Sequence, residues 1–261
     1  MHPILFYLGD SAVHSYGVMG ALGFLAVCWV SLTRGTLEGV DREKTADILF
    51  WTSLAGLLGS RVLFILVNPS FFSGPADWIN LRTGGLVFYG AFLAGIPAAS
   101  FLMWRHQLSF FQMWDIFATA MPLGHAISRF GCFLAGCCYG RPTDLPWGIT
   151  FTDDRAVAPL GTRLHPTQLY ELSALLTIFA IVNLTHAKRR FQGQSMLLYL
   201  GLYAVARTGS EFFRADPTRG WFMESVLGRL LSTSQALSLL VGAAALVVFL
   251  GVARAKSRAA K

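Results

Sequence analysis

The chain has 261 residues, of which 54% are hydrophobic and only 13% charged, with a mean hydropathy of +0.53. Charged residues make up about a quarter of a typical water-soluble domain, so these values exclude that class and indicate a membrane protein. The formal net charge is +7, but no basic run reaches the roughly five residues of a nucleic-acid-binding tail. An anionic lipid surface is therefore the expected partner, and nucleic acid is not.

Apolar segments of about twenty residues, long enough to cross about 30 Å of hydrocarbon, recur along the chain. We predict seven spanning helices, near residues 14–33, 46–67, 86–104, 110–128, 167–186, 194–213 and 235–254. The predicted fold class is an all-α polytopic membrane protein with a single transmembrane domain over residues 1–261. The first ten residues lack a basic stretch and a small-residue cleavage site, so no cleaved signal peptide is expected.

Two segments between the predicted helices do not have a helical pattern. Residues 141–166 are rich in Pro and Gly and contain the alternating run WGITF, which predicts a short strand in a small lobe outside the membrane, between the fourth and fifth helices. Residues 68–86 mix aromatic residues with Pro and Gly, which is typical of a segment at the membrane interface.

The distribution of basic residues predicts the orientation. Alternate loops hold eleven basic residues, including all four lysines, and this side is expected to face the cytoplasm. The other side holds eight, all arginine: Arg82, Arg129, Arg141, Arg155, Arg163, Arg214, Arg219 and Arg229. The amino terminus is then periplasmic and the carboxyl terminus cytoplasmic, in a bacterial inner membrane. A guanidinium holds phosphate bidentately, so a phosphate ligand is expected on the outer side, although lipid-headgroup anchoring also explains a single surface arginine.

Ionisable residues within the predicted spans indicate a site. Arg61, Arg207 and Glu211 each carry a cost of about 2.5–3.5 kcal/mol at the bilayer centre, so such side chains normally face a protein or aqueous interior. We expect Arg61, Arg129 and Arg207 to converge just beneath the outer surface. Arg207, Glu211 and Arg214 recur at i, i+4 and i+7 and share one helical face. Arg207 and Glu211 alone also fit an ion pair that only neutralises buried charge.

The cysteines do not have the spacing of a metal site. Cys28 lies in a predicted helix, and Cys132, Cys137 and Cys138 lie in the stretch HAISRFGCFLAGCCYGRP, without a CxxC pair or a His/Cys set of zinc-site spacing. No metal and no cofactor are therefore expected.

Several motifs, in order, resemble the bacterial prolipoprotein diacylglyceryl transferase family across nearly the whole chain. They are HSYGVMGALGF at 14–24, GSRVLFILV at 59–67, GGLVFYGAFLAG at 84–95, SRFGCFLAGCCYGR at 128–141, LHPTQLYE at 164–171, RTGSEFFRADP at 207–217 and LSTSQALSLLVG at 231–242. The resemblance implies seven spanning helices with the amino terminus outside.

The resemblance also implies an activity. The family transfers the diacylglyceryl group of phosphatidylglycerol to the thiol of a cysteine in a lipoprotein-precursor signal peptide and releases glycerol phosphate. Arg129 and Arg207 match the family's essential arginines, Glu211 matches the acidic partner of the second, and Tyr16 matches a tyrosine near the lipid. Fixed cations at these positions stabilise the developing phosphate charge.

Two departures from the family pattern leave alternatives open. Tyr89 in GGLVFYGA stands where the family usually has the histidine proposed as the base, and a phenol of pKa about 10 is a poor base at neutral pH. His125, one turn before Arg129, is a possible substitute, as is His165. Alternatively, the field of the arginines lowers the pKa of the thiol and Tyr89 only hydrogen-bonds the lipid.

The second departure lies in the signature, where asparagine and glutamate are replaced by Cys132 and Cys137. A disulfide from Cys132 to Cys137 or Cys138 is one reading in an oxidising periplasm, and a nucleophilic cysteine that carries a covalent intermediate is another.

These considerations predict the site residues. Catalytic roles are expected for Arg129, Arg207, Glu211, Tyr89 and His125. Contacts with the lipid are expected for Tyr16, Arg61, Gly131, Cys132, Gly140 and Arg214. The leading hypothesis is the housekeeping transferase or a paralogue that lipidates another acceptor. The alternative is a phospholipid- or anion-binding transporter or assembly factor without catalysis.

Overall fold

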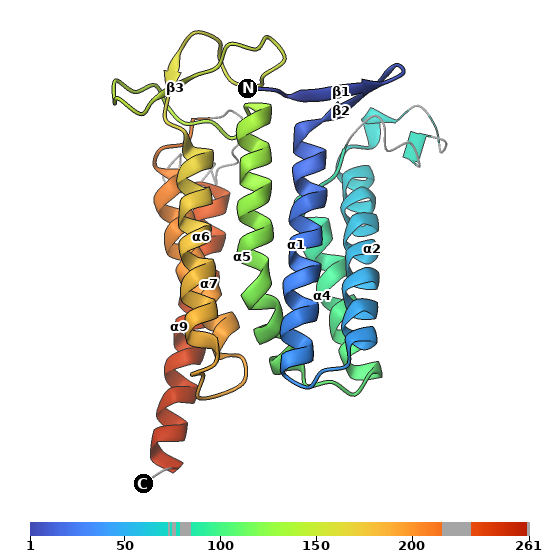
Figure 1. Cartoon of the computed structure of the whole chain (residues 1–261), viewed down its shortest axis with the longest axis vertical. Helices are drawn as coiled ribbons and strands as arrows, with labels where there is room; N and C mark the ends of the chain where they lie inside the picture. Colours follow the sequence, from blue (N-terminus) through green and yellow to red (C-terminus); the bar gives the residue numbers. More distant parts are fainter. Residues whose placement is uncertain (73, 75–76, 79–84, 216–230, 260–261) are drawn as a thin grey trace. The chain divides into compact units, whose positions relative to one another are not determined.

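A computed structural model of the chain describes residues 1–72, 74, 77–78, 85–215 and 231–259. Within these ranges seven α-helices are present (Figure 1). They are α1 (Ser15–Leu37), α2 (Arg42–Val67), α4 (Phe88–Arg105), α5 (Phe110–Ala135), α6 (Thr167–His186), α7 (Gln194–Glu211) and α9 (Thr233–Ala259). The seven predicted helices are confirmed as helices. Arg82, Arg219 and Arg229 lie outside the described residues.

Four of these helices are long and apolar enough to cross a membrane. They are α1, α2, α6 and the part of α9 from Thr233 to Ala255. A helical membrane protein is therefore supported, and the crossing of a membrane by all seven helices stays a prediction.

The predicted end of the fourth helix, near residue 128, is wrong, because α5 continues to Ala135. Phe130, Phe133 and Leu134 prolong the apolar pattern past Arg129, and the helix stops only before Gly136, which has a φ of +71°. Glycine adopts this left-handed conformation without a Cβ penalty and is the usual residue just after a helix. Arg129 is therefore a side chain inside a helix and not at its end.

The chain forms two compact units, Met1–Val30 with Trp114–Lys261, and Ser31–Met113. In the first unit α7 packs against α6 and α9. One core cluster contains Ala118, Ile178, Val182 and Tyr199. The prediction of a single transmembrane domain stays a prediction.

One side of α6 is buried along its whole length. Its buried residues, which after the adjacent pair at the start are spaced three or four apart, are Thr167, Gln168, Glu171, Leu175, Ile178, Val182 and His186. Positions at this spacing share a helical face. The face is polar near the start of α6, next to the lobe of residues 141–166, apolar in the middle and polar again at His186.

At the opposite end of the first unit, Asp115 caps α7. Its carboxylate accepts hydrogen bonds from the backbone N–H groups of Gly193, Ser195 and Met196 at 2.7, 2.8 and 3.1 Å. The first N–H groups of a helix have no partner within the helix, and an anion there also interacts favourably with the helix dipole. Arg189 adds a charge contact, with its Nε 3.5 Å from Oδ2.

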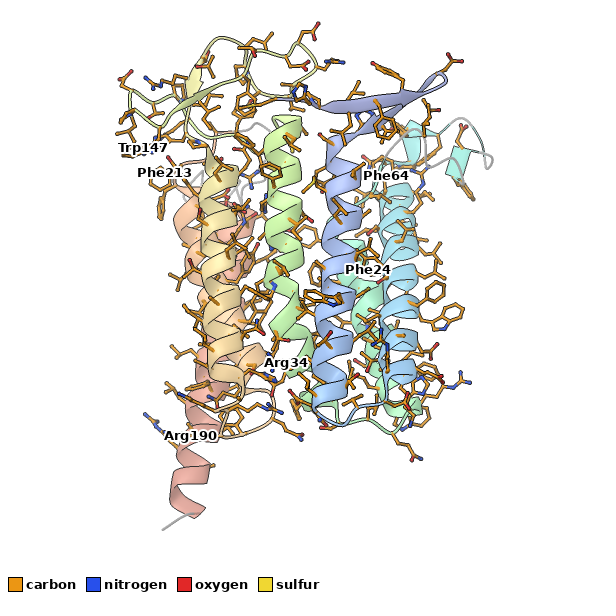
Figure 2. All side chains as sticks on the ribbon, in the orientation of Figure 1. Phe24, Arg34, Phe64, Trp147, Arg190 and Phe213 are labelled. Carbon is orange, nitrogen blue, oxygen red and sulfur yellow. The ribbon has the colours of Figure 1, made fainter. Side chains whose placement is uncertain are left out.

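The two ends of the first unit carry different kinds of side chain. Figure 2 shows Trp147 and Phe213 near one end and Arg190 at the other. The lobe at the first end contains the predicted strand, β3 (Ile149–Thr150), which pairs antiparallel with β4 (Arg163–Leu164). This contrast agrees with the predicted separation of the basic segment at 188–190 from the lobe.

An amino-terminal hairpin was not predicted. Strand β1 (Ile4–Leu8) pairs antiparallel with β2 (Ser11–His14) around the two-residue loop Gly9-Asp10, in which Gly9 has a φ of +58°. Gly-Asp between two short apolar runs is a recognised hairpin signal, so the sequence did contain this information.

The second unit is built on close contact between α2 and α4. A Cβ at Gly90 would meet backbone atoms of Gly59 and Ser60, and the Val87 N–H donates to the Ser60 carbonyl oxygen at 3.1 Å. Small residues at such a crossing allow two helix backbones to approach closely. Between α2 and α4 lies the 3-10 helix η1 (Pro69–Phe71), whose Phe71 ring packs edge-on against Phe64.

Candidate functional site: a buried arginine–glutamate cluster

Glu171 on α6 joins the two arginines that the sequence singled out. Its Oε2 lies 2.6 Å from Arg129 Nε on α5, and its Oε1 accepts a hydrogen bond of 2.9 Å from Arg207 Nη1 on α7. Ser210 donates its hydroxyl to the same Oε1 at 3.0 Å. Glu171 is only 5% exposed and Arg207 only 7%. Three helices thus meet at one buried carboxylate.

Glu211 forms the second half of the cluster. Arg207 Nη1 lies 2.8 Å from its Oε2, one helical turn away, and Arg214 Nη1 lies 3.9 Å from the same oxygen. Glu211 is 1% exposed. Arg207 and Glu211 share one face of α7, as the sequence predicts. The prediction is wrong for Arg214, because α7 ends at Glu211 and Arg214 forms a bridge with Gly140 beyond the helix. The ion pairs of the cluster are not confined to α7, because Arg207 also bonds Glu171.

Arginine side chains outnumber carboxylates in the cluster. Among the described residues its ion pairs join three guanidinium groups to two carboxylates. An anion that binds there gains charge-assisted hydrogen bonds from planar guanidinium forks. The arrangement is therefore suited to an anionic group such as a phosphate diester.

The start of α6 fixes the turn that follows α5. The Thr167 hydroxyl donates to the Cys138 carbonyl oxygen at 2.7 Å, and the Gln168 side-chain amide donates to the Cys137 carbonyl oxygen at 2.7 Å. Glu171 follows one turn later on the same face. The motif LHPTQLYE therefore both holds the cysteine-containing turn and supplies the carboxylate for the arginines.

Gly140 lies where three backbone segments meet. Its N–H donates to the His165 carbonyl oxygen at 3.1 Å, and it forms an antiparallel bridge with Arg214. A Cβ there would lie 2.6 Å from His165 Cβ and 2.8 Å from the Phe213 carbonyl oxygen. Gly140 was predicted to contact substrate; the structure gives it a packing role that draws the end of α7 toward the start of α6.

The His165 side chain lies beside Gly140. Its Nδ1 lies 3.1 Å from the Tyr170 hydroxyl, which also accepts a 2.8 Å hydrogen bond from Trp147 Nε1. Burial, and then the charge of Arg141, lower the pKa of the His165 imidazole below its usual value. The ring is therefore neutral at pH 7 and acts as a hydrogen-bonding group and not as a cation.

An open, mostly apolar pocket of about 450 Å³ adjoins the cluster. Trp147, Tyr170 and Phe213 are among its aromatic lining residues, and Ser210 also lines it. Because Ser210 hydrogen-bonds Glu171, the apolar surface continues directly into the charged groups. A ligand with a hydrocarbon part and an anionic part matches both surfaces.

Helix α1 approaches α5 through two glycines one heptad apart. A Cβ at Gly124 would lie 2.7 Å from the Gly23 carbonyl oxygen, and one at Gly131 would lie 2.8 Å from Met19 Cβ and 3.4 Å from Tyr16 Cα. The structure thus brings predicted residues Gly131 and Tyr16 together. The Tyr16 side chain is 52% exposed, so it is accessible to a lipid.

Predicted residues Arg61 and Tyr89 belong to the second unit. Arg61 is buried, and its guanidinium donates to the backbone carbonyl oxygens of Asp77, Trp78 and Gly85 at 2.8–3.1 Å. Tyr89 lies beside the α2–α4 crossing and is 45% exposed. Arg61 thus anchors the segment after α2, and its predicted convergence with Arg129 and Arg207 stays a prediction.

His125 and Cys132 are the remaining predicted residues. The His125 ring packs against the Tyr203 ring of α7, with centroids 5.3 Å apart. Cys132 is buried near the end of α5, and all four cysteines, which lie in the described part of the chain, are free. Neither observation tests the predicted roles.

The sequence reasoning missed Glu171 as a site residue. An acidic residue in an otherwise apolar predicted helix was the available signal, because such a residue normally faces the protein interior. It was quoted only as the last letter of a motif.

Residues 3–251 match the family model described as prolipoprotein diacylglyceryl transferase. The chain is 33% identical over 241 residues to the phosphatidylglycerol–prolipoprotein diacylglyceryl transferase of Clostridium tetani, covering 92% of this chain and 93% of that protein. Its identity is 34% over 243 residues to the protein of the same name from Chromohalobacter salexigens (90% and 89% covered), and 32% over 262 residues to that from Bordetella avium (98% and 96%). The chain therefore belongs to the prolipoprotein diacylglyceryl transferase family.

Proposed function

We propose that this protein transfers a diacylglyceryl group from phosphatidylglycerol to a prolipoprotein, the reaction for which its relatives are named. The observation that carries the proposal is the buried cluster in which three arginines gather around Glu171 and Glu211. Guanidinium forks bind a phosphodiester headgroup through charge-assisted hydrogen bonds. The adjoining apolar pocket suits the hydrocarbon part of the lipid or of its acceptor.

The acceptor is the thiol of a signal-peptide cysteine. Its sulfur attacks the glycerol carbon that carries the phosphate ester, a C–S bond forms, and the C–O bond to phosphate breaks. The electron pair of that bond leaves with glycerol phosphate, and the thiol proton passes to a base. Because negative charge grows on the leaving phosphate, pre-positioned arginines lower the barrier without reorganising.

Each charged residue then has a distinct role. Arg129 and Arg207 bind the phosphate, and Arg214 adds positive charge beside Glu211. Glu171 and Glu211 hold the guanidinium groups in position, as their short contacts with Arg129 and Arg207 support. Tyr16, beside Gly131, contacts the lipid from α1.

The base is proposed to be His125 in place of Tyr89. A neutral imidazole is the better proton acceptor near pH 7 than a phenol. His125 also lies on α5, one turn from Arg129, so both belong to the same helix face.

The setting is the bacterial inner membrane, with the amino terminus in the periplasm and the carboxyl terminus in the cytoplasm. In the first unit, Met1 packs against the lobe cluster that contains Tyr139 and Phe151, while α9 ends at the opposite end of the unit (Figure 1). A chain that crosses the membrane an odd number of times must have its two termini on opposite sides.

Complementation tests this function. The native transferase of a bacterial host is depleted, this chain is expressed, and a reporter precursor is examined by mass spectrometry for a diacylglyceryl thioether. We expect modification with the wild type and none with Arg207→Ala. Arg155→Ala, an exposed arginine of the lobe that pairs with Asp153, is the matched control and should modify the reporter normally.

Two results contradict the proposal. A membrane-inserted, well-expressed wild type that binds phosphatidylglycerol vesicles but leaves the reporter unmodified indicates the binding protein or transporter instead. Equal activity of Arg207→Ala and Arg155→Ala shows that the cluster is not the site.

A further inference from the structure

Three cysteine sulfurs gather beside the arginine–glutamate cluster. The Sγ atoms of Cys132, Cys137 and Cys138 all lie within 4.8 Å of one another. Cys132 is buried, and the other two are half-buried and so open to an incoming ion. Nothing in the proposed transfer reaction uses this thiol cluster.

The end of α5 brings the first two thiols together. The Cys137 N–H donates to the Cys132 carbonyl oxygen at 3.1 Å and the Gly136 N–H to the Phe133 carbonyl oxygen at 3.3 Å, while Gly136 has a φ of +71°. These are the bonds of a Schellman motif, in which the side chains corresponding to Cys132 and Cys137 normally touch. Two neighbouring small side chains at this point therefore need no special function.

Cys138 does need an explanation. Its φ is +58°, a left-handed conformation that glycine and asparagine adopt much more readily than other residues. The Thr167 hydroxyl holds its carbonyl oxygen at 2.7 Å. Strained positions of this kind persist where surrounding contacts enforce them, and they are concentrated at functional sites. The strain here brings a third sulfur to the other two.

We propose that Cys132, Cys137 and Cys138 bind one soft d¹⁰ cation, Cu(I) or Zn(II). Metal–sulfur bonds of about 2.3 Å require sulfurs roughly 3.8–4.0 Å apart, so a contraction of less than about 1 Å completes the site. Thiolates are the ligands that select these ions. A disulfide would use only two of the three sulfurs, whereas one ion uses all three.

The ligands become charged when the metal binds. Binding releases the thiol protons to solvent and places thiolates against the metal. Arg129, three residues before Cys132, belongs to the same face of α5 and offsets their negative charge. No His, Asp or Glu of the described ranges joins the sulfur group. Cu(I) is therefore held by three sulfurs alone, and Zn(II) adds a water as its fourth ligand.

The test measures metal binding by the full-length protein in detergent. The protein is reduced, desalted under argon, and incubated separately with Cu(I), Zn(II) and Mg(II), and bound metal is counted by mass spectrometry. We expect about one equivalent of Cu(I) or Zn(II) and no Mg(II). Cys132→Ser and Cys138→Ser should weaken binding about tenfold or more. Cys28→Ser, which alters the cysteine of α1 outside the group, is the matched control and should bind like the wild type.

X-ray absorption of the metal-loaded wild type keeps the test independent of variant folding. We expect three sulfur neighbours at about 2.3 Å. Two or fewer sulfurs, or equal binding by Cys132→Ser and Cys28→Ser, would overturn the proposal. So would a disulfide within the group in protein isolated from membranes without reductant. None of these readouts depends on transferase activity.

Discussion

Glu171 contacts three other side chains of the cluster. Its Oε1 accepts hydrogen bonds from Arg207 Nη1 at 2.9 Å and from the Ser210 hydroxyl at 3.0 Å. Its Oε2 lies 2.6 Å from Arg129 Nε. A buried ion pair is not by itself evidence of net stabilisation, but removal of one partner leaves an uncompensated charge and costs about 3–5 kcal/mol. Arg129 and Arg207 thus share this one carboxylate.

We predict that Glu171→Gln reduces transfer roughly 100-fold or more, because Arg129 and Arg207 lose the anion that positions them. Glutamine has nearly the same shape, so the change is mainly one of charge. Initial rates on a fluorescent precursor peptide in detergent measure the effect. The control is Glu43→Gln, which changes an exposed residue in the first turn of α2. Equal rates for the two variants would show that Glu171 has no positioning role.

The choice of base gives a second prediction at this scale. His125→Ala should slow transfer more than Tyr89→Phe does, because the imidazole accepts a proton near pH 7 and the phenol only donates a hydrogen bond. Because His125 also packs on Tyr203, His125→Gln is included to preserve most of its volume. The measurement is the rate of thioether formation from pH 6 to 8. The reverse order of effects assigns the base to Tyr89.

At the scale of elements, residues 137–142 tie three helices together. Their backbone pairs with His165 before α6 and with Phe213 after α7, and their carbonyl oxygens accept hydrogen bonds from Thr167 and Gln168. Arg129, Glu171 and Arg207 are therefore held in place by backbone contacts as well as by their own charges. A substitution that displaces this segment should therefore disturb the site even though it removes no charged group.

Gly140→Ala tests this prediction. The added Cβ would lie 2.6–2.8 Å from atoms of His165 and Phe213, mostly backbone, so the segments must separate. We expect a lower unfolding temperature and a loss of transfer of about tenfold or more, since small displacements of positioned groups are costly. Gly201→Ala is the matched control, because a Cβ there meets nothing within 4 Å. Thermal unfolding and initial rates are measured on both, and similar behaviour would contradict the predicted role of Gly140.

At the scale of the whole molecule, the positions of the charged residues in the first unit predict an orientation in the membrane. The arginine–glutamate cluster, the lobe and the hairpin β1–β2 all belong to the first unit, and the basic residues 188–190 lie at its other end (Figures 1 and 2). This is the arrangement expected of an enzyme whose lipid and precursor react at the outer leaflet.

We predict that the lobe is periplasmic and the carboxyl terminus cytoplasmic, because basic residues are retained on the cytoplasmic side. Alkaline phosphatase inserted after Asp154, whose side chain is 89% exposed, should be active. Green fluorescent protein at the carboxyl terminus should fluoresce. As controls, the two reporters are exchanged between these sites, and neither should then give a signal. Signals from the exchanged pair would show that the topology is the reverse of the predicted one.

The sequence by itself determined the helices, the membrane class and most of the charged residues of the site. Long apolar runs specify spanning helices almost independently of their neighbours, and a charge within such a run is costly enough to mark an interior. The same local information predicted the strand in WGITF and the shared helical face of Arg207 and Glu211. It failed at the end of α5, where Gly136 and not the arginine stops the helix.

Only the tertiary structure decided which residues meet. Glu171 bonds Arg207 across 36 positions of the chain, and Thr167 bonds the carbonyl oxygen of Cys138 across 29. No rule based on spacing along the sequence predicts such pairs, because they depend on how the helices pack and how the turns between them are folded. The cysteines were judged by their separation along the chain, which has no metal-site pattern. A Schellman turn and one strained residue gathered their sulfurs, since a folded backbone places side chains by geometry and not by sequence distance.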